Sequence, residues 1–275
     1  TFNYIKAKYL IQERPYNTSQ IRNEIFHKYG GKICSVIQRN IYQINGVGMY
    51  INADILFTFG NSREIIERVN KTLGGNVKKF IPVGSLFTER ELYNRKEKND
   101  FPEYDLLVFN SDHHGDASSP NNNYFKDYYE HFNWIRKFAE EFPKFKIAVK
   151  NKKQFYDKKA RSILEKLSNV ELLIDKKFEW SDSYFLGSKA KALCTWNSTL
   201  GIEFIGEGKE CYFLDPGLRN TSWLPNDRYF LKVKVKSYEE FREKILLKLK
   251  GHKDNGVLEN QKEYCYPGSN VSKNI

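Results

Sequence analysis

The sequence lacks any long hydrophobic run, and its apolar segments are short, as at Ile147-Ala148-Val149. A helix that spans a bilayer needs roughly 20 consecutive apolar residues. We therefore expect no transmembrane helix, and no signal peptide is recognisable. Cysteine is scarce as well, and its four positions are widely separated, without Cys-x-x-Cys spacing: Cys34, Cys194, Cys211 and Cys265. This predicts free thiols in a reducing compartment, no zinc site and a cytoplasmic location.

An arginine-rich arm and a glycine-flanked aromatic RNA-binding motif are also missing, although the net charge is +11. The lysines are spread over expected helix faces, as at Lys158, Lys159 and Lys166. One interpretation is a solvated basic surface that attracts anionic lipid or a phosphorylated substrate. The other is a nucleic-acid-binding surface. We favour the first, which predicts peripheral contact with the inner face of an anionic membrane and no nucleic-acid partner.

Aromatic residues are abundant, with 18 Tyr and 20 Phe, which excludes a disordered chain. Strand-like and helix-like segments alternate, and this order predicts a parallel α/β fold. The expected strands are 32–38, 54–59, 78–83, 104–109, 146–150, 170–174, 192–195, 210–214 and 230–235. The expected helices are 17–29, 61–73, 123–142, 158–167, 181–188, 200–205 and one that Ser237 opens with Glu240 as its capping partner.

The charged segment 89–103 has no apolar periodicity, and we predict a linker there. The chain then divides into a partial N-terminal Rossmann-like domain at 1–100 and a second Rossmann-like domain at 101–275 that ends with a helix. The first residue is Thr1, and an apolar pattern follows at once. We expect a piece of a longer protein whose N-terminal domain is incomplete here.

The segment 193–216 carries the most specific chemical pattern. A short apolar strand runs into Ser198 and Thr199, which begin a helix, and Glu203 follows one turn later. The free N–H groups of a helix start, with two added hydroxyls, suit a phosphate. Thr199 and Glu203 are four residues apart and share one helix face, about 6 Å apart along the axis. The alternative is that both hydroxyls only cap the helix and that Glu203 is a solvated surface residue.

The order of residues in this segment resembles the donor-binding segment of GT-B glycosyltransferases. It is most similar to bacterial capsule and surface-carbohydrate enzymes and to the related CDP-glycerol glycerophosphotransferases. The matching positions are Asn197-Ser198-Thr199, Glu203, Gly208-Lys209 and Asp215-Pro216. The resemblance implies two Rossmann-like domains with parallel sheets. It also implies that Ser198 and Thr199 hold the donor phosphates and that Glu203 binds the ribose. Asn197 is a further donor-binding candidate, and Trp196, which directly precedes this phosphate loop, is a candidate for lining the base pocket.

Two further segments fit this resemblance. Lys150 matches the lysine of a Lys-x-His-Pro motif, but the His-Pro is absent, so Lys150 is either a phosphate clamp or an exposed lysine at a strand end. Gln38 matches the family's Gln-His-Gly region, where Arg39 and Asn40 replace His-Gly. We place Gln38 and Arg39 on the acceptor side of the cleft. The stretch 52–60 and the later Val83-Gly84-Ser85 resemble the end of the family's N-terminal domain.

The loop 112–116 contains Asp112, His113 and His114, which are candidates for a general base near the acceptor hydroxyl. A polar loop with Asx turns is the competing interpretation. Adjacent histidines rarely converge on one ion, so a metal is the least favoured interpretation, and we predict neither a metal nor a cofactor.

Together these features predict a GT-B glycosyltransferase that moves a sugar from a nucleotide-sugar donor to a surface polysaccharide or a lipid-linked acceptor. Such an enzyme stabilises the leaving nucleotide with fixed hydrogen-bond donors and needs no metal. Three alternatives stay open: a CDP-glycerol glycerophosphotransferase, a basic nucleic-acid-binding module, and a non-catalytic domain that binds glycan or partner proteins.

Overall fold

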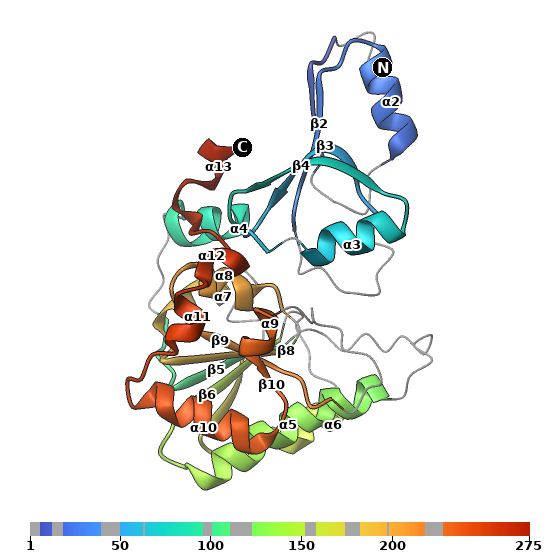
Figure 1. The fold of residues 1–275 in the computed structure, drawn as a ribbon. Helices are drawn as coiled ribbons and strands as arrows, with labels where there is room; N and C mark the ends of the chain where they lie inside the picture. The colour runs from blue at the N-terminus through green and yellow to red at the C-terminus, as the bar shows by residue number, and fades with distance from the viewer. Residues whose placement is uncertain are drawn as a thin grey trace.

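The computed structural model describes residues 6–12, 19–39, 50–62, 64–95, 101–110, 123–151, 158–173, 182–196, 198–217 and 228–275. The strands of these segments form two sheets, one of four strands and one of six (Figure 1). Every pair of neighbouring strands is parallel. The predicted α/β class with two parallel sheets is confirmed.

The first sheet has the order β1-β2-β3-β4. Its strands are β1 (Tyr9–Gln12), β2 (Ile33–Ile37), β3 (Asn52–Thr58) and β4 (Asn76–Pro82), with helices α2 (Gln20–Lys28) and α3 (Glu64–Thr72) between them. Ser19 begins α2, because its side chain accepts a hydrogen bond from the Arg22 N–H. Gly74 follows α3 with a φ of 76°, a left-handed conformation that glycine adopts without strain.

The second sheet has the order β10-β9-β8-β5-β6-β7. Its strands are β5 (Leu106–Asn110), β6 (Ile147–Asn151), β7 (Val170–Leu173), β8 (Ala192–Trp196), β9 (Cys211–Leu214) and β10 (Lys234–Val235). Its helices are α5 (Asn123–Glu141), α6 (Lys158–Leu164), α7 (Asp182–Lys189), α8 (Leu200–Gly206), α9 (Phe230–Val233) and α10 (Tyr238–Leu249). All residues of β5, β6, β8 and β9 are buried, as expected for a parallel sheet covered on both faces.

Alternate residues of these strands build two separate cores. Leu107 and Phe109 point towards α7, α8 and α9, where the Phe109 ring stacks on Phe204 with centroids 5.6 Å apart. Leu106 and Val108 point towards α5, α6 and α10 on the other face. Figure 1 shows these two helix layers on opposite sides of the sheet. Packing on both faces fixes the sheet, and so it fixes the positions of the carboxyl ends of its strands.

The C-terminal segment returns to the first sheet (Figure 1). It contains α11 (Asn255–Leu258), α12 (Gln261–Tyr264), η4 (Gly268–Asn270) and α13 (Val271–Asn274). The Tyr266 N–H donates to the Phe59 carbonyl over 2.8 Å. A Cβ on Gly60 would lie 2.6 Å from the Tyr264 backbone, so only glycine allows this close approach. These contacts attach the C-terminal segment to the first sheet. The predicted domain boundary at residue 100 stays a prediction.

Two expected elements differ from the structure. The predicted linker 89–103 begins with the π-helix η3 (Glu89–Tyr93), which directly follows the helical turn α4 (Leu86–Thr88). Its charge is misleading because Glu89 is buried and accepts hydrogen bonds from Ser272 in the C-terminal segment. The expected strand 230–235 is α9 followed by the two-residue β10, because Phe230 and Val233 are spaced for one face of a helix and are both buried.

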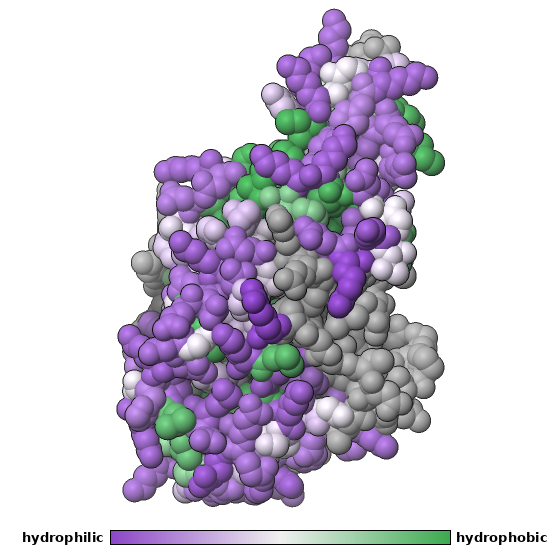
Figure 2. Space-filling view, in the orientation of Figure 1, coloured by the Kyte–Doolittle hydropathy of each residue, from purple (hydrophilic) through white to green (hydrophobic). Residues whose placement is uncertain are grey.

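The face in Figure 2 is largely hydrophilic, and its green areas include patches over the upper part, where the first sheet lies. Among the residues of the first-sheet region, exposed large hydrophobic side chains include Tyr9 and Ile11 of β1 and Ile21 of α2. Within the described segments, every helix is too short or too polar to cross a bilayer.

Candidate functional site

The carboxyl edge of the second sheet contains a topological switch point between β5 and β8. From β5 the chain proceeds to β6 and β7 on one side, whereas β8, β9 and β10 lie on the other side. Open parallel sheets bind ligands in the crevice at the carboxyl ends of the strands beside such a point. Asn110 is the last residue of β5, and its register partners are Asn151 of β6 and Trp196 of β8. These three residues are buried and form the floor beneath this edge.

Amide hydrogen bonds hold this floor together. The Asn110 Nδ2 donates to the Asn151 Oδ1 over 2.6 Å and to the Tyr128 hydroxyl over 3.1 Å. Lys150 precedes Asn151 and is only 2% exposed. The interpretation of Lys150 as an exposed lysine at a strand end is therefore wrong, while its role as a phosphate clamp stays a prediction.

Trp196 lies in the core below this edge. Its residue is 1% exposed, and its ring stacks on His131 of α5 with centroids 4.9 Å apart and planes within 7°. Burial lowers the pKa of His131 to about 3, against weaker opposing contributions from backbone hydrogen bonds, so this imidazole is neutral at physiological pH. One face of the Trp196 ring is thus covered by His131, and a contact with a nucleotide base stays a prediction.

The amino end of α8 lies directly beyond β8 and is half-buried from Ser198 to Leu200. The Ser198 N–H donates to the Thr195 Oγ1 over 3.2 Å, and the Ser198 Oγ accepts a long 3.4 Å bond from the Leu200 N–H. Thr199 occupies the N-cap position, but its side chain makes no capping hydrogen bond. The interpretation of both hydroxyls as ordinary caps therefore fails for Thr199.

Glu203 is 3% exposed, so its interpretation as a solvated surface residue is wrong. One carboxylate oxygen accepts a short hydrogen bond from the Ser85 hydroxyl, and the other accepts from the Tyr184 hydroxyl over 3.1 Å. Burial raises the pKa of Glu203 to about 7, although both hydroxyl bonds oppose this rise. The two oxygens of this buried carboxylate therefore already have protein donors, with which the hydroxyls of a ribose would compete.

Ser85, Tyr184 and Glu203 form what we call the sheet junction. Ser85 follows β4 of the first sheet, whereas Tyr184 and Glu203 lie on α7 and α8 of the second-sheet region. A neighbouring ion pair joins Arg95 to Asp182 over 2.8 Å and strengthens the same contact between the two parts. The sequence patterns included Ser85 in a family-like motif but gave no signal for Tyr184, which lies on a short and almost wholly buried helix.

The two predicted acceptor-side residues lie at the carboxyl edge of the first sheet. The Gln38 Oε1 accepts from the Phe59 N–H over 2.8 Å and so links the ends of β2 and β3. The Arg39 guanidinium lies 5.4 Å from the centre of the Phe87 ring. Ser85 follows β4 at this same edge, so the junction brings the carboxyl edge of the first sheet to α8. The acceptor role of Gln38 and Arg39 stays a prediction.

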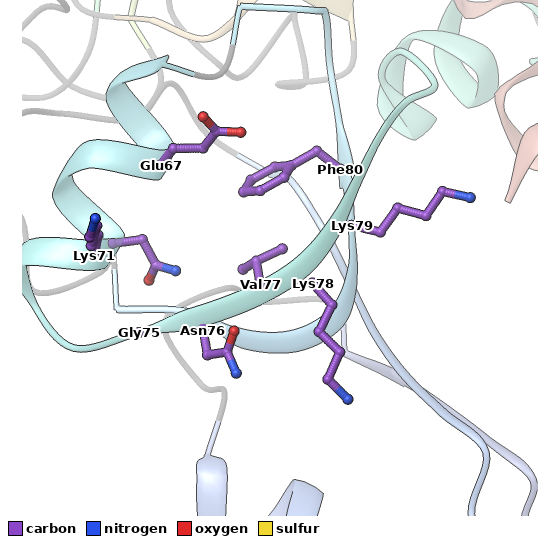
Figure 3. A pocket seen from close by; sticks show the side chains of 9 residues that line it. Glu67, Lys71, Gly75, Asn76, Val77, Lys78, Lys79 and Phe80 are labelled. Atoms are coloured by element: carbon purple, nitrogen blue, oxygen red, sulfur yellow. The ribbon is translucent and has the colours of Figure 1, made fainter.

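Four predicted site residues lie outside the described part of the chain: Asp112, His113, His114 and Asn197. A separate pocket of about 570 Å³ lies between α3 and the edge strand β4 (Figure 3). Its lining includes Glu67 and Lys71 of α3 and Lys78 and Lys79 of β4, and none of the predicted site residues. It is therefore a different feature from the carboxyl edge of the second sheet.

No protein-family model matches the chain, and no curated protein matches it. Solved structures do match. S. aureus MnaA in a co-structure with UDP has a TM-score of 0.59 at 10% identity, over 99% of this chain and 73% of that one. The Neisseria meningitidis UDP-GlcNAc 2-epimerase bound to UDP-GlcNAc matches with a TM-score of 0.60 at 13% identity, over 99% of this chain and 75% of that one. The Methanocaldococcus jannaschii UDP-GlcNAc 2-epimerase in complex with UDP-GlcNAc and UDP matches with a TM-score of 0.53 at 13% identity, over 99% of this chain and 76% of that one.

At 10–13% identity these similarities concern the fold alone. They cover almost the whole of this chain and about three quarters of each neighbour, so both sheets take part in the match. The chain therefore has a GT-B-like two-domain architecture that is structurally similar to nucleotide-sugar-using enzymes.

Proposed function

We propose that this chain is part of a metal-independent glycosyltransferase that binds a nucleotide-sugar donor at the carboxyl edge of the second sheet. The acceptor is a surface polysaccharide or a lipid-linked glycan. The observation that carries the proposal is the switch point between β5 and β8, with the half-buried start of α8 directly beyond β8. The structural neighbours support it, since they are described with UDP or UDP-GlcNAc bound.

The leaving diphosphate would be stabilised by donors that the fold already holds in place. These are the N–H groups at the start of α8, the hydroxyls of Ser198 and Thr199, and the ammonium group of Lys150. Asn197 would complete the phosphate loop, and Trp196 would border the base. The candidates for the base that takes the proton of the acceptor hydroxyl are Asp112, His113 and His114, which precede α5 in the sequence.

Glu203 has a specific place in this proposal. Its carboxylate already binds two hydroxyl groups, those of Ser85 and Tyr184, and a ribose offers two hydroxyl groups of the same kind. Donor binding would exchange protein hydroxyls for ribose hydroxyls at one carboxylate. The exchange would loosen the sheet junction from Ser85, so that donor binding and the relative position of the two sheets become coupled.

Titration calorimetry with UDP and UDP-GlcNAc tests the phosphate contacts. Thr199→Val removes one hydroxyl at nearly constant volume and should weaken UDP binding about tenfold, the loss of one charge-assisted hydrogen bond. Thr72→Val on the exposed end of α3 is the matched control and should bind like the wild type. Equal affinities for all three proteins would rule out a hydrogen bond between the Thr199 hydroxyl and the phosphate.

A second candidate reaction is epimerisation of the nucleotide sugar, which is favoured by the naming of two structural neighbours as UDP-GlcNAc 2-epimerases. Proton NMR of a UDP-GlcNAc incubation separates the two reactions. Transfer releases UDP only when an acceptor is present, whereas epimerisation yields a new sugar nucleotide without an acceptor. CDP-glycerol in the same assay tests glycerophosphate transfer, which would release CMP.

A further inference from the structure

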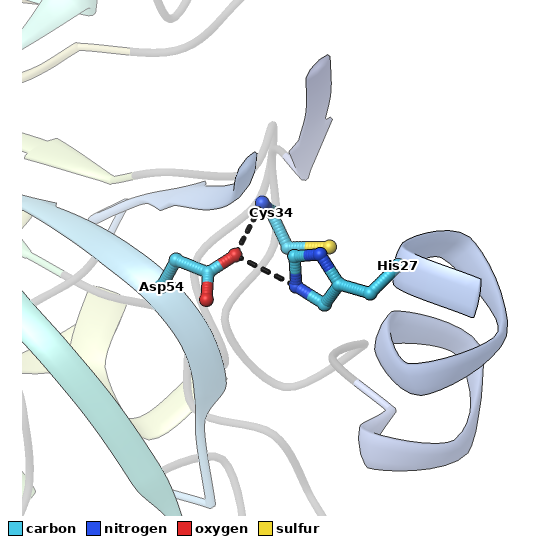
Figure 4. Close-up of side chains that lie close together, drawn as sticks. All are labelled: His27, Cys34 and Asp54. Carbon is cyan, nitrogen blue, oxygen red and sulfur yellow. Dashed lines mark hydrogen bonds and ion pairs between the residues drawn. The ribbon is translucent and has the colours of Figure 1, made fainter. Parts of the chain in front are cut away.

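A second group of reactive side chains lies at the opposite, amino edge of the first sheet. His27 is near the end of α2, Cys34 is the second residue of β2, and Asp54 is the third residue of β3 (Figure 4). We call these three residues the amino-edge cluster. One ligand atom from each lies within 4.8 Å of the other two. None of them belongs to the predicted donor or acceptor site.

The imidazole of His27 faces oxygen acceptors at both of its nitrogens. Its Nδ1 lies 3.1 Å from the Gly31 carbonyl oxygen, and its Nε2 lies 2.9 Å from the Asp54 Oδ2. A carbonyl oxygen can only accept, so Nδ1 carries a hydrogen. Nε2 then either carries a second proton or directs its lone pair to a cation. A histidine whose Nδ1–H is held by a backbone carbonyl is the usual arrangement for metal binding through Nε2.

The other two side chains complete a suitable set of ligands. Asp54 is fixed in place by the Cys34 N–H, 2.7 Å from Oδ2, and by the Lys78 ammonium, 2.7 Å from Oδ1. Burial raises the pKa of the Cys34 thiol to about 11, and the Asp54 charge adds to the rise, so the thiol stays neutral without a cation. The His27 side chain is 35% exposed and offers a path for an ion from solvent.

We propose that His27 Nε2, the Asp54 carboxylate and the Cys34 sulfur bind one zinc-class divalent transition-metal ion. Nitrogen, carboxylate and thiolate ligands suit this class and disfavour Mg²⁺ and Ca²⁺, and solvent would take the fourth tetrahedral position. On binding, the Cys34 sulfur and the His27 Nε2 each lose a proton to solvent, and they form the metal–sulfur and metal–nitrogen bonds. The ion would join α2 to β2 and β3, a structural role that goes beyond the proposed transferase activity.

Cobalt(II) added to the metal-free 275-residue chain is the probe, because a cobalt–thiolate bond absorbs in the near ultraviolet and tetrahedral cobalt absorbs in the visible. The wild type should bind one equivalent with both absorptions. Cys34→Ser should lose the near-ultraviolet band, and His27→Gln should bind more than tenfold more weakly. His252→Ala, at an exposed position away from the cluster, should behave like the wild type.

The wild-type titration decides the proposal even where a variant folds poorly. Absence of saturable binding, or binding without the thiolate band, would overturn it and leave the cluster as a His27–Asp54 ion pair. Retention of the band in Cys34→Ser would overturn it as well, because it would assign the thiolate to another cysteine. Circular dichroism of each variant checks that the fold is intact.

Discussion

Two carboxylates near opposite edges of the first sheet show how local partners decide the charge of a buried acid. Glu203, at the sheet junction, is bonded to two neutral hydroxyls, and burial raises its pKa to about 7. For Asp54, at the amino edge of the first sheet, burial also acts to raise the pKa. There the Cys34 N–H, Lys78 and His27 outweigh it, and the pKa of Asp54 is lowered.

The difference separates a site that can change its charge from a site that keeps it. Glu203 gains or loses a proton near neutral pH, at the contact between the two sheets, where a ligand that offers hydroxyls would compete with Ser85 and Tyr184. Asp54 stays ionised and holds cations, which suits a structural tie between α2 and the first sheet. The two carboxylates therefore affect stability in opposite directions as the pH changes.

The largest expected effect comes from Glu203→Gln. The pKa of Glu203 rises on folding from 4.5 to about 7, so the folded protein keeps a proton that the unfolded chain has lost, and wild-type stability falls as the pH rises through this window. The glutamine variant lacks this loss. Its free energy of unfolding relative to the wild type should rise by up to about 3 kcal/mol from pH 5 to pH 8, measured by urea unfolding.

If the difference in the free energy of unfolding between Glu203→Gln and the wild type stays constant with pH, Glu203 is already ionised or exposed in the folded protein.

Asp54→Asn should show the opposite dependence and a smaller effect. The lowered pKa of Asp54 stabilises the folded protein above the pKa of the unfolded chain, and that contribution is lost as the pH falls through the folded-state pKa. The variant should be less stable than the wild type by about 2 kcal/mol at pH 7, the loss of charge-assisted hydrogen bonds. The deficit should shrink in acid, and a deficit that grows in acid would refute the assignment.

Tyr184→Phe sharpens the comparison at the junction. It removes one of the two hydroxyls that oppose the rise in the pKa of Glu203, so this pKa should move above about 7. The free energy of unfolding at neutral pH should fall by about 1 kcal/mol. Carbon-13 NMR of labelled glutamate follows the titration directly, and an unchanged midpoint would show that Tyr184 does not contact the carboxylate in solution.

Lys78→Met is expected to have the smallest effect. The Lys78 side chain is 66% exposed, and an ion pair with an exposed partner contributes only roughly 0.5 kcal/mol to the free energy of unfolding. The pKa of Asp54 should rise, while the Cys34 N–H and His27 continue to lower it. An NMR titration of Asp54 measures this, and a return to the ordinary value would make Lys78 the decisive partner.

The sequence predicts the sheets well because buried parallel strands are short apolar runs between amphipathic helices. Nearly every expected strand reappears within a few residues, and the predicted capping of α10 is confirmed, since the Ser237 Oγ accepts from the Glu240 N–H over 3.1 Å. The errors arise where tertiary contacts override the local pattern. Glu89 is charged yet buried, because the backbone N–H and the hydroxyl of Ser272 in the distant C-terminal segment donate hydrogen bonds to it.

The candidate site is only partly predictable for the same reason. The strand-to-helix pattern at Ser198 and Thr199 is local and recognisable, and the structure has both the strand and the helix. The partners of Glu203 are not local, because Ser85 lies 118 residues away in the sequence. Cys34 and Asp54 meet through the register of β2 with β3, in which Ser35 lies opposite Ile55, and single-sequence patterns do not fix a register.

Hydrogen–deuterium exchange with and without UDP tests most directly whether the carboxyl edge of the second sheet binds the nucleotide. The account predicts slower exchange in the peptides that cover β8 and the start of α8, residues 192–206, with no change at the pocket between α3 and β4, residues 64–82. Slower exchange confined to residues 64–82, or none anywhere at saturating UDP, would contradict it.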